Sequence, residues 1–511
     1  MKTPIIDFVE KYIKNKPVRV HMPGHKGRGP YGRFSDIYKY DITEIDGADY
    51  LSAPGGIIAE SEQNASRMFG CPTYYSAEGS SLCIRAMLFM IKKTAVQEGR
   101  KPRILAGRNA HSTFVNAAAL LDIDVDWIMP LREESYESCT VTGQDIENYI
   151  PAADSIVDNL TEHTRKKCVY DALYVTSPDY LGNMLNISEL AETCHRYGML
   201  LLVDNAHGAY LKFLEQSLFP IDLGADMCSS SAHKTLPVLT GGAYLHISDR
   251  CRKIYTDGDI RKALSAFAST SPSYLILQSL DLCNEYLEKT AKQGKVYRLA
   301  AERVDKIKKS LGYFVIPNVY DESLKVYNHD KKLGLAIIGN EPLKLTIMFS
   351  GILDGNKVAE DLAEHNIYVE YHDKDHIVFM FSPMNTEEDY KAVEDELLRI
   401  IKRDLTSVHI EEGVSPCTER ETKVSEELGE ATLLDELKIH SRLLAPERKM
   451  SPKEAMMAPS EAVMVKDSIG RILASPVLTC PPCVPLYMCG EVIGENISDY
   501  YSGEIMVVKQ I

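Results

Sequence analysis

The stretch SSSAHKTLPVLTGGAYLH, residues 229–246, places one lysine, Lys234, among small and apolar residues. The letters before it, ADMCSS, are typical of the end of a strand, so the lysine follows a strand directly. Lysine is usually solvated at a protein surface. A lysine in apolar surroundings is either held in a structural ion pair or has a lowered pKa that lets its neutral amine act as a nucleophile.

Other polar residues follow expected strands in the same way: His111, Asp204, His207 and Ser231. The segment SAEGSSLCIRAML (76–88) adds a glycine and two serines at the start of an expected helix, where free backbone N–H groups and hydroxyls favour a phosphate. Each feature has a structural alternative. A Gly-Ser-Ser sequence usually only caps a helix, and Asp204 could cap a helix or form an ion pair with the lysine.

Together these residues match the needs of one cofactor, pyridoxal 5'-phosphate. It requires a lysine for a Schiff base, an acid that keeps its ring nitrogen protonated, a phosphate cup and a flat group stacked on its ring. The sequence offers a candidate for each need: Lys234, Asp204, a cup of Gly79, Ser80, Ser81 and Ser231, and His111. His233, beside the lysine, is a further candidate for contact with the cofactor or, alternatively, a packing histidine.

These residues require elements that bring them together. Between about 60 and 250, helical patterns alternate with short apolar strands, as in ALYVTSP (172–178), ISELAETCHRYG (187–198) and MLLLVDNAHG (199–208). This alternation predicts an α/β fold with a mostly parallel sheet covered by helices. Ligands bind at the carboxyl ends of the strands in such sheets, which is where the candidates lie.

The chain has 511 residues, too many for a single core, so we expect several units. We predict an irregular N-terminal arm (1–60), a large cofactor-binding domain (61–310), a smaller α+β domain (311–403), a linker (404–449) and a small C-terminal domain (450–511). The arm contains HMPGHKGRGPYGRFSD, whose glycines and prolines exclude one long helix. Residues 251–310 are predicted to be mostly helical, with one long helix or two at their end.

Composition limits the partners and the compartment. A formal net charge of −16 argues against nucleic acid and anionic membranes. The segment MKTPIIDFVEKYIKNK lacks the apolar run of a signal peptide, and the 12 cysteines form no disulfide framework, so we expect a cytoplasmic protein. Cys480, Cys483 and Cys489 raise the alternative of a zinc or redox site, but without a second ligand pair we expect a proline-rich turn and no metal.

Six motifs, HMPGHKGR, DITEIDGADYL, RNAHST, VDNAHGAYL, SAHKTL and STSPSY, together resemble the bacterial Orn/Lys/Arg decarboxylases, which are fold-type-I pyridoxal-phosphate enzymes. The resemblance covers about residues 20 to 400 and continues in MSPKEAMMAPSEAVMVKDSIGRILASPV and PPCVPLYMCGEVI. It implies a large domain of the fold-type-I transferase kind. It also implies decarboxylation of arginine, lysine or ornithine to a polyamine-type amine and carbon dioxide.

The resemblance also implies roles for single residues. Lys234 would form the Schiff base, Asp204 would hold the ring nitrogen and His111 would stack on the ring, with His207 near the cofactor. The residues that would hold the phosphate are Ser80, Ser81 and Ser231.

The motif STSPSY, residues 269–274, would enter the active site of a neighbouring subunit, with Ser269 and Thr270 near the phosphate. We therefore expect a homodimer or tetramer with shared active sites. Because the segment FASTSPSYLIL (267–277) is attributed to the neighbouring site, it is not expected to reach the pocket of its own chain.

The sequence departs from the family pattern at three places. Ser112 stands where many members have lysine, Glu78 stands where related enzymes often have asparagine, and PPCVP replaces PPGIP. Another fold-type-I enzyme, such as an aminotransferase, lyase or aldolase, and a non-catalytic regulatory homologue are the alternative functions. Aminotransferases usually hold the substrate carboxylate with a small-domain arginine, and no arginine occurs between Arg303 and Arg399.

The substrate's distal cation needs an acidic partner. Glu370 and Asp373, in YVEYHDKDH, are candidates, with a solvated face as the alternative for each. The sequence does not distinguish arginine, lysine and ornithine.

Overall fold

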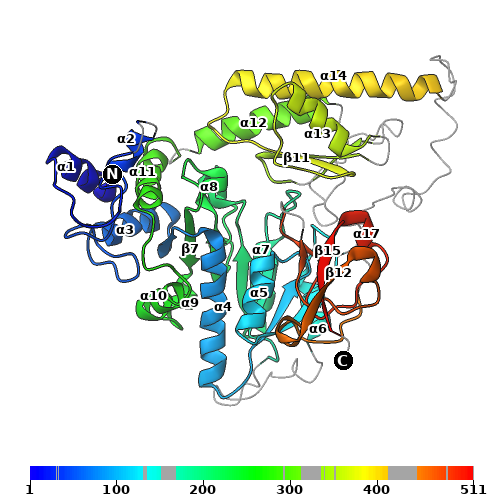
Figure 1. The fold of residues 1–511 in the computed structure, drawn as a ribbon, viewed down its shortest axis with the longest axis horizontal. Helices are drawn as coiled ribbons and strands as arrows, with labels where there is room; N and C mark the ends of the chain where they lie inside the picture. Colours follow the sequence, from blue (N-terminus) through cyan, green and yellow to red (C-terminus); the bar gives the residue numbers. More distant parts are fainter. Residues whose placement is uncertain are drawn as a thin grey trace.

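The computed structural model describes residues 1–29, 32, 34–130, 135–150, 168–291, 294–311, 335–338, 340–349, 353–411, 446–478 and 482–509. A seven-stranded sheet forms the centre of the molecule, in the order β1-β7-β6-β5-β4-β2-β3 (Figure 1). Strands β2 to β6 pair in parallel, and β7 lies antiparallel between β1 and β6. The expected mostly parallel α/β sheet is therefore confirmed. The strands are β1 (Thr73–Ser76), β2 (Arg103–Gly107), β3 (Asp124–Ile128), β4 (Ala172–Thr176), β5 (Leu200–Asp204), β6 (Met227–Ser230) and β7 (Ala243–Ile247).

Helices cover both faces of this sheet because successive strand residues point to opposite sides. Tyr174 and Leu202 pack into one apolar core with α4 (Gly79–Gln97) and α5 (Ser112–Leu120). Their neighbours Leu173 and Leu201 pack into a second core with α6 (Gly143–Tyr149) and α7 (Ile187–Arg196). A parallel sheet is buried on both faces. Because helices cover both faces here, the candidate residues emerge at the carboxyl ends of the strands.

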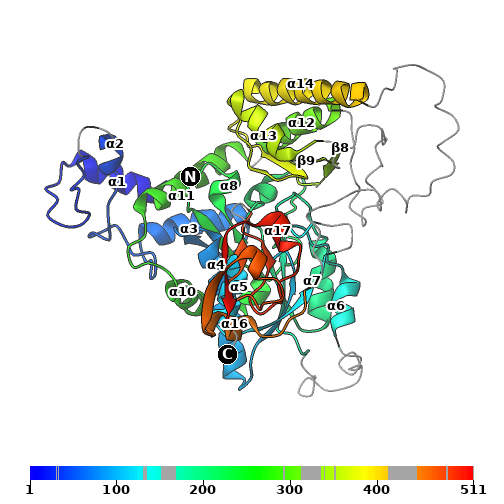
Figure 2. The same ribbon diagram turned by 45° about the vertical axis from the view of Figure 1, so that its right-hand side comes forward.

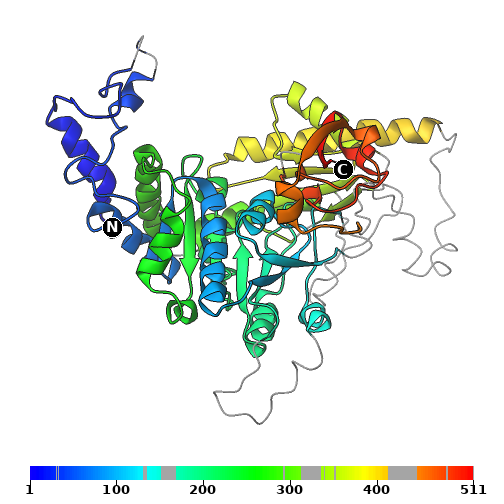
Figure 3. The same ribbon diagram turned by 60° about the horizontal axis from the view of Figure 1, so that its bottom comes forward.

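The N-terminal segment is not irregular throughout. Helix α1 (Pro4–Lys14) begins with a proline in its first turn, where a proline costs no hydrogen bond. Its residues Ile5 and Val9 are buried against α3 (Ile57–Phe69) and α11 (Tyr274–Thr290). Only residues after this helix form an extended arm, which includes the short α2 (Ser35–Tyr38). The arm stands away from the body in Figure 2 and Figure 3.

Helices dominate residues 249–310, as expected. They are α9 (Asp249–Arg252), α10 (Asp257–Ser265), α11 and α12 (Lys295–Ser310). The last two are separate helices, because α12 starts after Gly294, whose φ of +64° belongs to the left-handed region that a helix interior does not contain.

A smaller sheet and two helices form the expected α+β unit. Its strand order is β10-β11-β9-β8, and its helices lie on one side of the sheet in Figure 1. The elements are β8 (Leu335–Ile338), β9 (Lys344–Phe349), α13 (Gly355–Glu364), β10 (Tyr371–His372), β11 (His376–Met380) and α14 (Glu387–Glu411). Helix α14 runs past the predicted start of the linker at 404, and residues 412–445 of that linker lie outside the described residues.

The C-terminal unit packs beside α5 and is built of short elements. They are α16 (Pro452–Met457), β12 (Ser460–Met464), β13 (Val477–Leu478), β14 (Pro485–Tyr487), α17 (Ile497–Tyr500) and β15 (Glu504–Val508), with a single 3-10 turn at Val465–Asp467. Among the described residues, no helix combines the length and apolar character of a membrane span.

Candidate active site

Lys234 lies in a four-residue helix, α8 (Ala232–Thr235), directly after β6. Its Nζ is 2.9 Å from Nε2 of His207, which follows the neighbouring strand β5. Burial, together with the charge of Lys234, holds the pKa of His207 well below its usual range. The two nitrogens therefore do not both carry a full positive charge. This pair exists because the carboxyl ends of neighbouring parallel strands meet at one edge of the sheet.

Asp204 is the last residue of β5, and its side chain is buried. Its carboxylate accepts hydrogen bonds from the Tyr174 hydroxyl at 3.1 Å, the Ser229 hydroxyl at 3.4 Å and the Ala206 amide at 3.1 Å. These neutral donors satisfy the buried carboxylate and hold it in place. The position suits a carboxylate that supports a protonated ring nitrogen.

His111 caps the amino end of α5 with its ring. Its Nδ1 accepts from the Thr113 amide at 3.1 Å, which sets the orientation of the imidazole. Burial lowers the pKa of His111, while the charge of Asp204 raises it and that of Lys234 lowers it. The structure thus brings His111 into the electrostatic neighbourhood of both residues, as an uncharged flat ring.

The structure brings together the residues predicted to hold a phosphate, with one change for Gly79, and binding of a phosphate stays a prediction. The Ser80 hydroxyl lies 2.6 Å from the Ser231 hydroxyl, and the Ser81 hydroxyl lies 3.0 Å from that of Thr113. Gly79 begins α4 with φ +71°, but its N–H donates to the Gly241 carbonyl at 2.7 Å. Gly79 therefore supplies the turn and not a free N–H. The amides of the two serines are in the first turn of the helix and have no acceptor within it.

His233 is bound to the turn that also binds the cup glycine, since Gly242 directly follows Gly241. Both its backbone N–H, at 3.2 Å, and its Nδ1, at 3.1 Å, lie within hydrogen-bond distance of the Gly242 carbonyl. Burial lowers its pKa. These contacts agree with the alternative of a packing histidine, and contact with the cofactor stays a prediction.

Residues 267–277 contact their own chain at one point beside the cup, and the expectation that they do not reach their own chain's pocket stays a prediction. The Ser269 amide donates to Glu78 Oε1 at 2.6 Å, and Glu78 directly precedes the cup glycine in the same chain. The reason is tertiary, because the start of α11 is bound to the base of the arm and thereby turns residues 269–273 toward α4. The side chains of Ser269 and Thr270 are exposed, so their contact with a neighbouring subunit's phosphate stays a prediction.

A second side of the site contains the candidate acid Glu370 together with Tyr180 and Lys344, which the sequence analysis did not identify. The Tyr180 ring packs edge-on against His207, with ring centroids 5.2 Å apart. Its hydroxyl donates to Glu370 Oε1 at 2.9 Å. Beneath it, Lys344 Nζ donates to the carbonyls of Asp179 and Tyr180, both at 3.0 Å, and lies 5.5 Å from the tyrosine ring.

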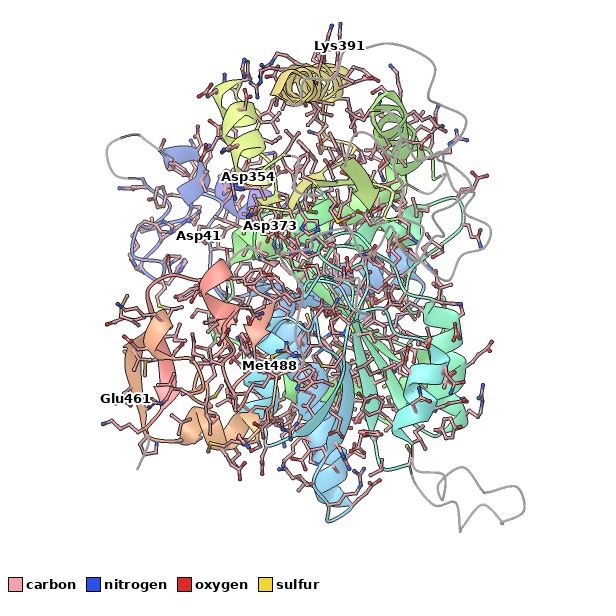
Figure 4. All side chains as sticks on the ribbon, turned by 90° about the vertical axis from the view of Figure 1, so that its right-hand side faces the viewer. Asp41, Asp354, Asp373, Lys391, Glu461 and Met488 are labelled. Carbon is pink, nitrogen blue, oxygen red and sulfur yellow. The ribbon has the colours of Figure 1, made fainter. Side chains whose placement is uncertain are left out.

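Lys344 is 2% exposed, and burial lowers its pKa to about 8. The signal for it was in the sequence: a lysine inside the apolar stretch LKLTIMFS is the same anomaly that identified Lys234. Of the two acids proposed for the substrate, Glu370 lies on this wall. Asp373, which is labelled in Figure 4, is instead engaged in its own turn. Its carboxylate accepts from the amides of Asp375 at 2.7 Å and His376 at 2.6 Å.

The C-terminal unit supports His111 from outside the sheet. The Ser112 amide donates to the Cys483 carbonyl at 2.9 Å. The buried guanidinium of Arg108 donates to Glu491 at 2.8 Å and to the carbonyls of Pro485 and Leu486 at 3.0 and 3.1 Å. The motif RNAHST therefore joins His111 to a unit almost four hundred residues away in the chain.

The three cysteines of the proposed zinc or redox alternative do not form a described cluster. Burial raises the pKa of Cys489 to about 12, whereas a redox or metal-binding thiol needs a lowered pKa. Cys480 lies outside the described residues. Cys483 occupies the turn at φ +59°, the position where the family has glycine.

The residues present fit pyridoxal phosphate. Nδ1 of His207 is buried without a hydrogen-bond partner, so the site contains a polar atom that the protein itself does not satisfy. The first-turn amides and the three serine hydroxyls offer donors for a phosphate, and Asp204 offers the carboxylate for a ring nitrogen. Lys234 stands beside this histidine, with its Nζ 2.9 Å from Nε2 of the same ring.

Comparison with known proteins agrees with this site. The model of the Orn/Lys/Arg decarboxylase major domain matches residues 3–389, and that of the family's C-terminal domain matches residues 436–504. An arginine decarboxylase of Bacillus subtilis (strain 168) is 28% identical over 510 residues, covering 97% of this chain and 92% of the relative. A lysine decarboxylase of Pseudomonas aeruginosa is 22% identical, covering 94% and 73%.

The fold is shared with solved structures. The crystal structure of a Francisella novicida lysine decarboxylase superposes with a TM-score of 0.72 at 17% identity, covering 99% of this chain and 81% of that one. The structure of the constitutive lysine decarboxylase of E. coli gives a TM-score of 0.68. The large domain therefore has the fold-type-I architecture of pyridoxal-phosphate enzymes, and the chain belongs to the Orn/Lys/Arg decarboxylase family, whose enzymes depend on this cofactor.

Proposed function

We propose that this chain decarboxylates a basic amino acid, arginine, lysine or ornithine, to the corresponding amine and carbon dioxide. The observation that carries the proposal is the Lys234–His207 pair at the carboxyl ends of β5 and β6, with Asp204 on the same edge. Arginine is the first substrate to test, because a carboxylate on the far wall suits a guanidinium and the B. subtilis relative is an arginine decarboxylase.

Each part of the cofactor has a residue to hold it. Lys234 would bond it covalently, Asp204 would pair with its ring nitrogen, and His111 would lie against its ring. The residues for its phosphate are Ser80, Ser81 and Ser231. The chemistry that pyridoxal phosphate supplies when bound is an electron sink for the pair released as carbon dioxide departs.

The protein has two tasks beyond holding the cofactor. The first is to deliver one proton to the carbon that lost its carboxyl group. Lys234 Nζ, 2.9 Å from His207 Nε2, is placed to hold and pass that proton, because the low proton affinity of His207 leaves the proton with the amine. The second task is to orient the substrate so that its carboxylate is the group that leaves.

Glu370 performs this second task in the proposal. Glu370 is exposed, and its carboxylate accepts from the hydroxyl of Tyr180, whose ring packs against His207 beside Lys234. A substrate whose cationic end binds Glu370 is held at that end and, through its amino group, at the cofactor. Attachment at both ends orients its α-carboxylate as the leaving group. The buried cation Lys344 is turned toward backbone carbonyls, so it does not compete for the substrate's carboxylate as an aminotransferase arginine would.

A related fold-type-I lyase or aldolase is the alternative for which the same cofactor residues would serve. A non-catalytic homologue would also bind the cofactor at Lys234. Turnover separates these functions, and cofactor attachment alone does not. The proposal includes a homodimer, or a tetramer built from it, with Ser269 and Thr270 near the partner's phosphate.

Two measurements test the proposal. Borohydride reduction of the cofactor-loaded protein followed by peptide mapping should place the pyridoxyl label on Lys234, and a label on another lysine would refute the assignment. Release of carbon dioxide from arginine, lysine and ornithine should identify one preferred substrate. A labelled protein that releases carbon dioxide from none of the three would contradict the proposed reaction.

A further inference from the structure

Three side chains that can offer ligands to a metal ion meet outside the active site. They are Glu137, Asp373 and His376, and one ligand atom of each lies within 4.8 Å of those of the other two. Glu137 lies in the large domain after β3, Asp373 lies in the turn between β10 and β11, and His376 begins β11. A metal ion contacts such atoms at about 2.0 to 2.6 Å, so small shifts of the side chains would let one ion reach all three.

The turn of the small sheet holds two of these ligands beside each other. The Asp373 carboxylate accepts from the Tyr371 hydroxyl at 2.9 Å, in addition to the two amides of its turn. Nδ1 of His376 lies 3.2 and 3.3 Å from the two oxygens of the same carboxylate. Ligands that neighbouring hydrogen bonds orient in this way are typical of metal sites. An ion would bind between His376 and Asp373 and replace their direct contact.

Glu137 provides the observation that indicates a ligand. Its side chain is 0% exposed, and its Oε1 has no hydrogen-bond partner in the described part of the protein. Its Oε2 accepts a long hydrogen bond from the Ser135 hydroxyl at 3.3 Å. The Tyr371 hydroxyl, which lies close to both acids, has one proton and donates it to Asp373. A buried carboxylate oxygen without a donor is unfavourable, and a bound cation would satisfy it.

A second group of the same three residue types joins α13 and α14: Asp361, His365 and Glu396. Its carboxylates are already paired with a guanidinium. Nη2 of Arg399 donates to Asp361 at 2.6 Å, and Nε of Arg399 donates to Glu396 at 2.8 Å. By contrast, no lysine or arginine among the described residues pairs with Glu137, and the cationic partner of Asp373 is His376. The buried group therefore has two carboxylates for one imidazole.

The ligand types indicate the class of ion. One imidazole with two carboxylates suits Mn²⁺ or Zn²⁺, whereas Mg²⁺ and Ca²⁺ prefer oxygen ligands throughout. The Asp373 side chain is 24% exposed, so an ion can enter beside it and keep water as a further ligand.

We propose that Glu137, Asp373 and His376 bind one divalent transition-metal ion, which fastens the small sheet to the large domain. The segment that carries Glu137 is itself fixed to the loop after β4, because the Ser138 hydroxyl donates to Asp179 at 2.7 Å. The ion therefore joins two segments that each belong to a well-held part of the fold. The expectation of no metal was based on the cysteines, and this site uses none of them.

The ion is separate from the proposed reaction. Two aromatic rings stand between the three ligands and His207. Tyr371 packs edge-on against Tyr180, with ring centroids 5.4 Å apart, and Tyr180 packs in the same way against His207. Metal binding therefore does not depend on the proposed function, and no step of the reaction is assigned to the ion.

The first experiment measures binding of Mn²⁺ to the cofactor-loaded full chain after a chelator has removed bound metal. Thiols prefer softer ions than Mn²⁺, so the 12 cysteines interfere less than they would with Zn²⁺. Loss of the free-ion signal in electron paramagnetic resonance should give one bound Mn²⁺ per chain. Glu137→Gln and His376→Asn should each weaken binding at least about tenfold. Asp361→Asn, from the second group, is the matched control and should bind like the wild type.

The second experiment separates a metal site from a buried ion pair. Saturating Mn²⁺ should raise the melting temperature of the wild type by about 3 °C, because the ion binds only the folded chain. Without the ion, Glu137→Gln should melt no lower than the wild type, because it removes a buried charge that repels Asp373. With Mn²⁺ added, its melting temperature should not change. Circular dichroism verifies that the variant is folded and measures both temperatures.

Absence of Mn²⁺ binding by the wild type, or equal binding by Glu137→Gln, would overturn the proposal. An ion bound to the cofactor would be retained by both variants and would appear as the second of these results. A lower melting temperature of Glu137→Gln, with no response of the wild type to Mn²⁺, would show that Glu137 serves only as a partner of His376. Failure of the proposed reaction would leave all of these measurements unchanged.

Discussion

The two sides of the active site are built in different ways. On one side Lys234, His207 and Asp204 follow neighbouring strands, and each is placed within four residues of a strand end. On the other side Tyr180, Lys344 and Glu370 meet through contacts that join residues 164 to 190 positions apart. The first side therefore depends only on one edge of the large sheet. The second side forms only when the small sheet packs on the large one.

This difference assigns different tasks to the two sides. Residues at a sheet edge are held by the sheet itself, so they suit the covalent and proton-transfer chemistry that tolerates little displacement. The wall of Tyr180, Lys344 and Glu370 depends on a second unit, so its residues can change without disturbing that chemistry. It therefore suits the recognition of the substrate's side chain. Changes on the sheet side should lower kcat, whereas changes on the wall should alter KM or the pH profile.

The largest effect is expected on the sheet side. Asp204→Asn should keep the cofactor but lower kcat by about a hundredfold or more, because an amide does not hold the ring nitrogen's proton by charge. Absorbance of the bound cofactor and carbon dioxide release measure the two quantities. Near-normal kcat would show that the role given to this carboxylate is wrong.

A smaller effect is expected on the wall. Glu370→Gln should raise KM for the preferred basic substrate by about tenfold, with kcat little changed, because one charge-assisted contact to the substrate is lost. Asp373→Asn is the matched control on the same unit, because Asp373 is engaged by the amides of its own turn. Equal effects of both changes on KM would remove the distinction between these two acids.

The buried Lys344, on the wall, should affect the pH dependence of the sheet-side residue His207. Burial and the charge of Lys234 lower the pKa of His207 most, and the charge of Lys344 adds to them, so Lys344→Met should raise that pKa. A histidine that gains its proton at higher pH is neutral over a narrower range. The acid limb of the kcat/KM profile should therefore move to higher pH, by about half a unit.

Lys344→Arg keeps the charge and should leave the acid limb in place. If both variants move the limb equally, packing and not charge connects this residue to His207. A limb that is unmoved in Lys344→Met would show that the two sides are electrostatically independent.

The smallest effect concerns the C-terminal turn that supports His111. Cys483 has φ +59°, a conformation that costs a residue with a Cβ about 1 kcal/mol. Cys483→Gly should increase the free energy of unfolding by about 0.5 kcal/mol after the flexibility of glycine in the unfolded chain is included. Cys483→Ala should be neutral, since it keeps the Cβ. Urea denaturation of both variants measures the difference, and a loss of stability in the glycine variant would contradict the argument.

The sequence by itself determined the sheet edge. Alternating strands and helices implied parallel pairing, and parallel pairing implied that carboxyl ends share an edge. Lys234, His207 and Asp204 could therefore be placed together from the order of the residues alone. Ser80 and Ser81 of the cup were predicted on a different ground, their position at the start of a helix. Each of these inferences needed only the local pattern and one topological rule.

Only the tertiary structure decided the rest, because the contacts concerned are too distant in the chain for local signals to predict. Arg108 finds Glu491 across 383 positions, Glu370 meets Tyr180 across 190, and Ser269 returns to Glu78 across 191. Local patterns also misjudged residues whose partners are remote. Gly79 gives its N–H to Gly241, and helix α1 forms where an irregular arm was predicted, because α3 and α11 bury its apolar face. A helix of that length is marginal alone, and packing is what stabilises it.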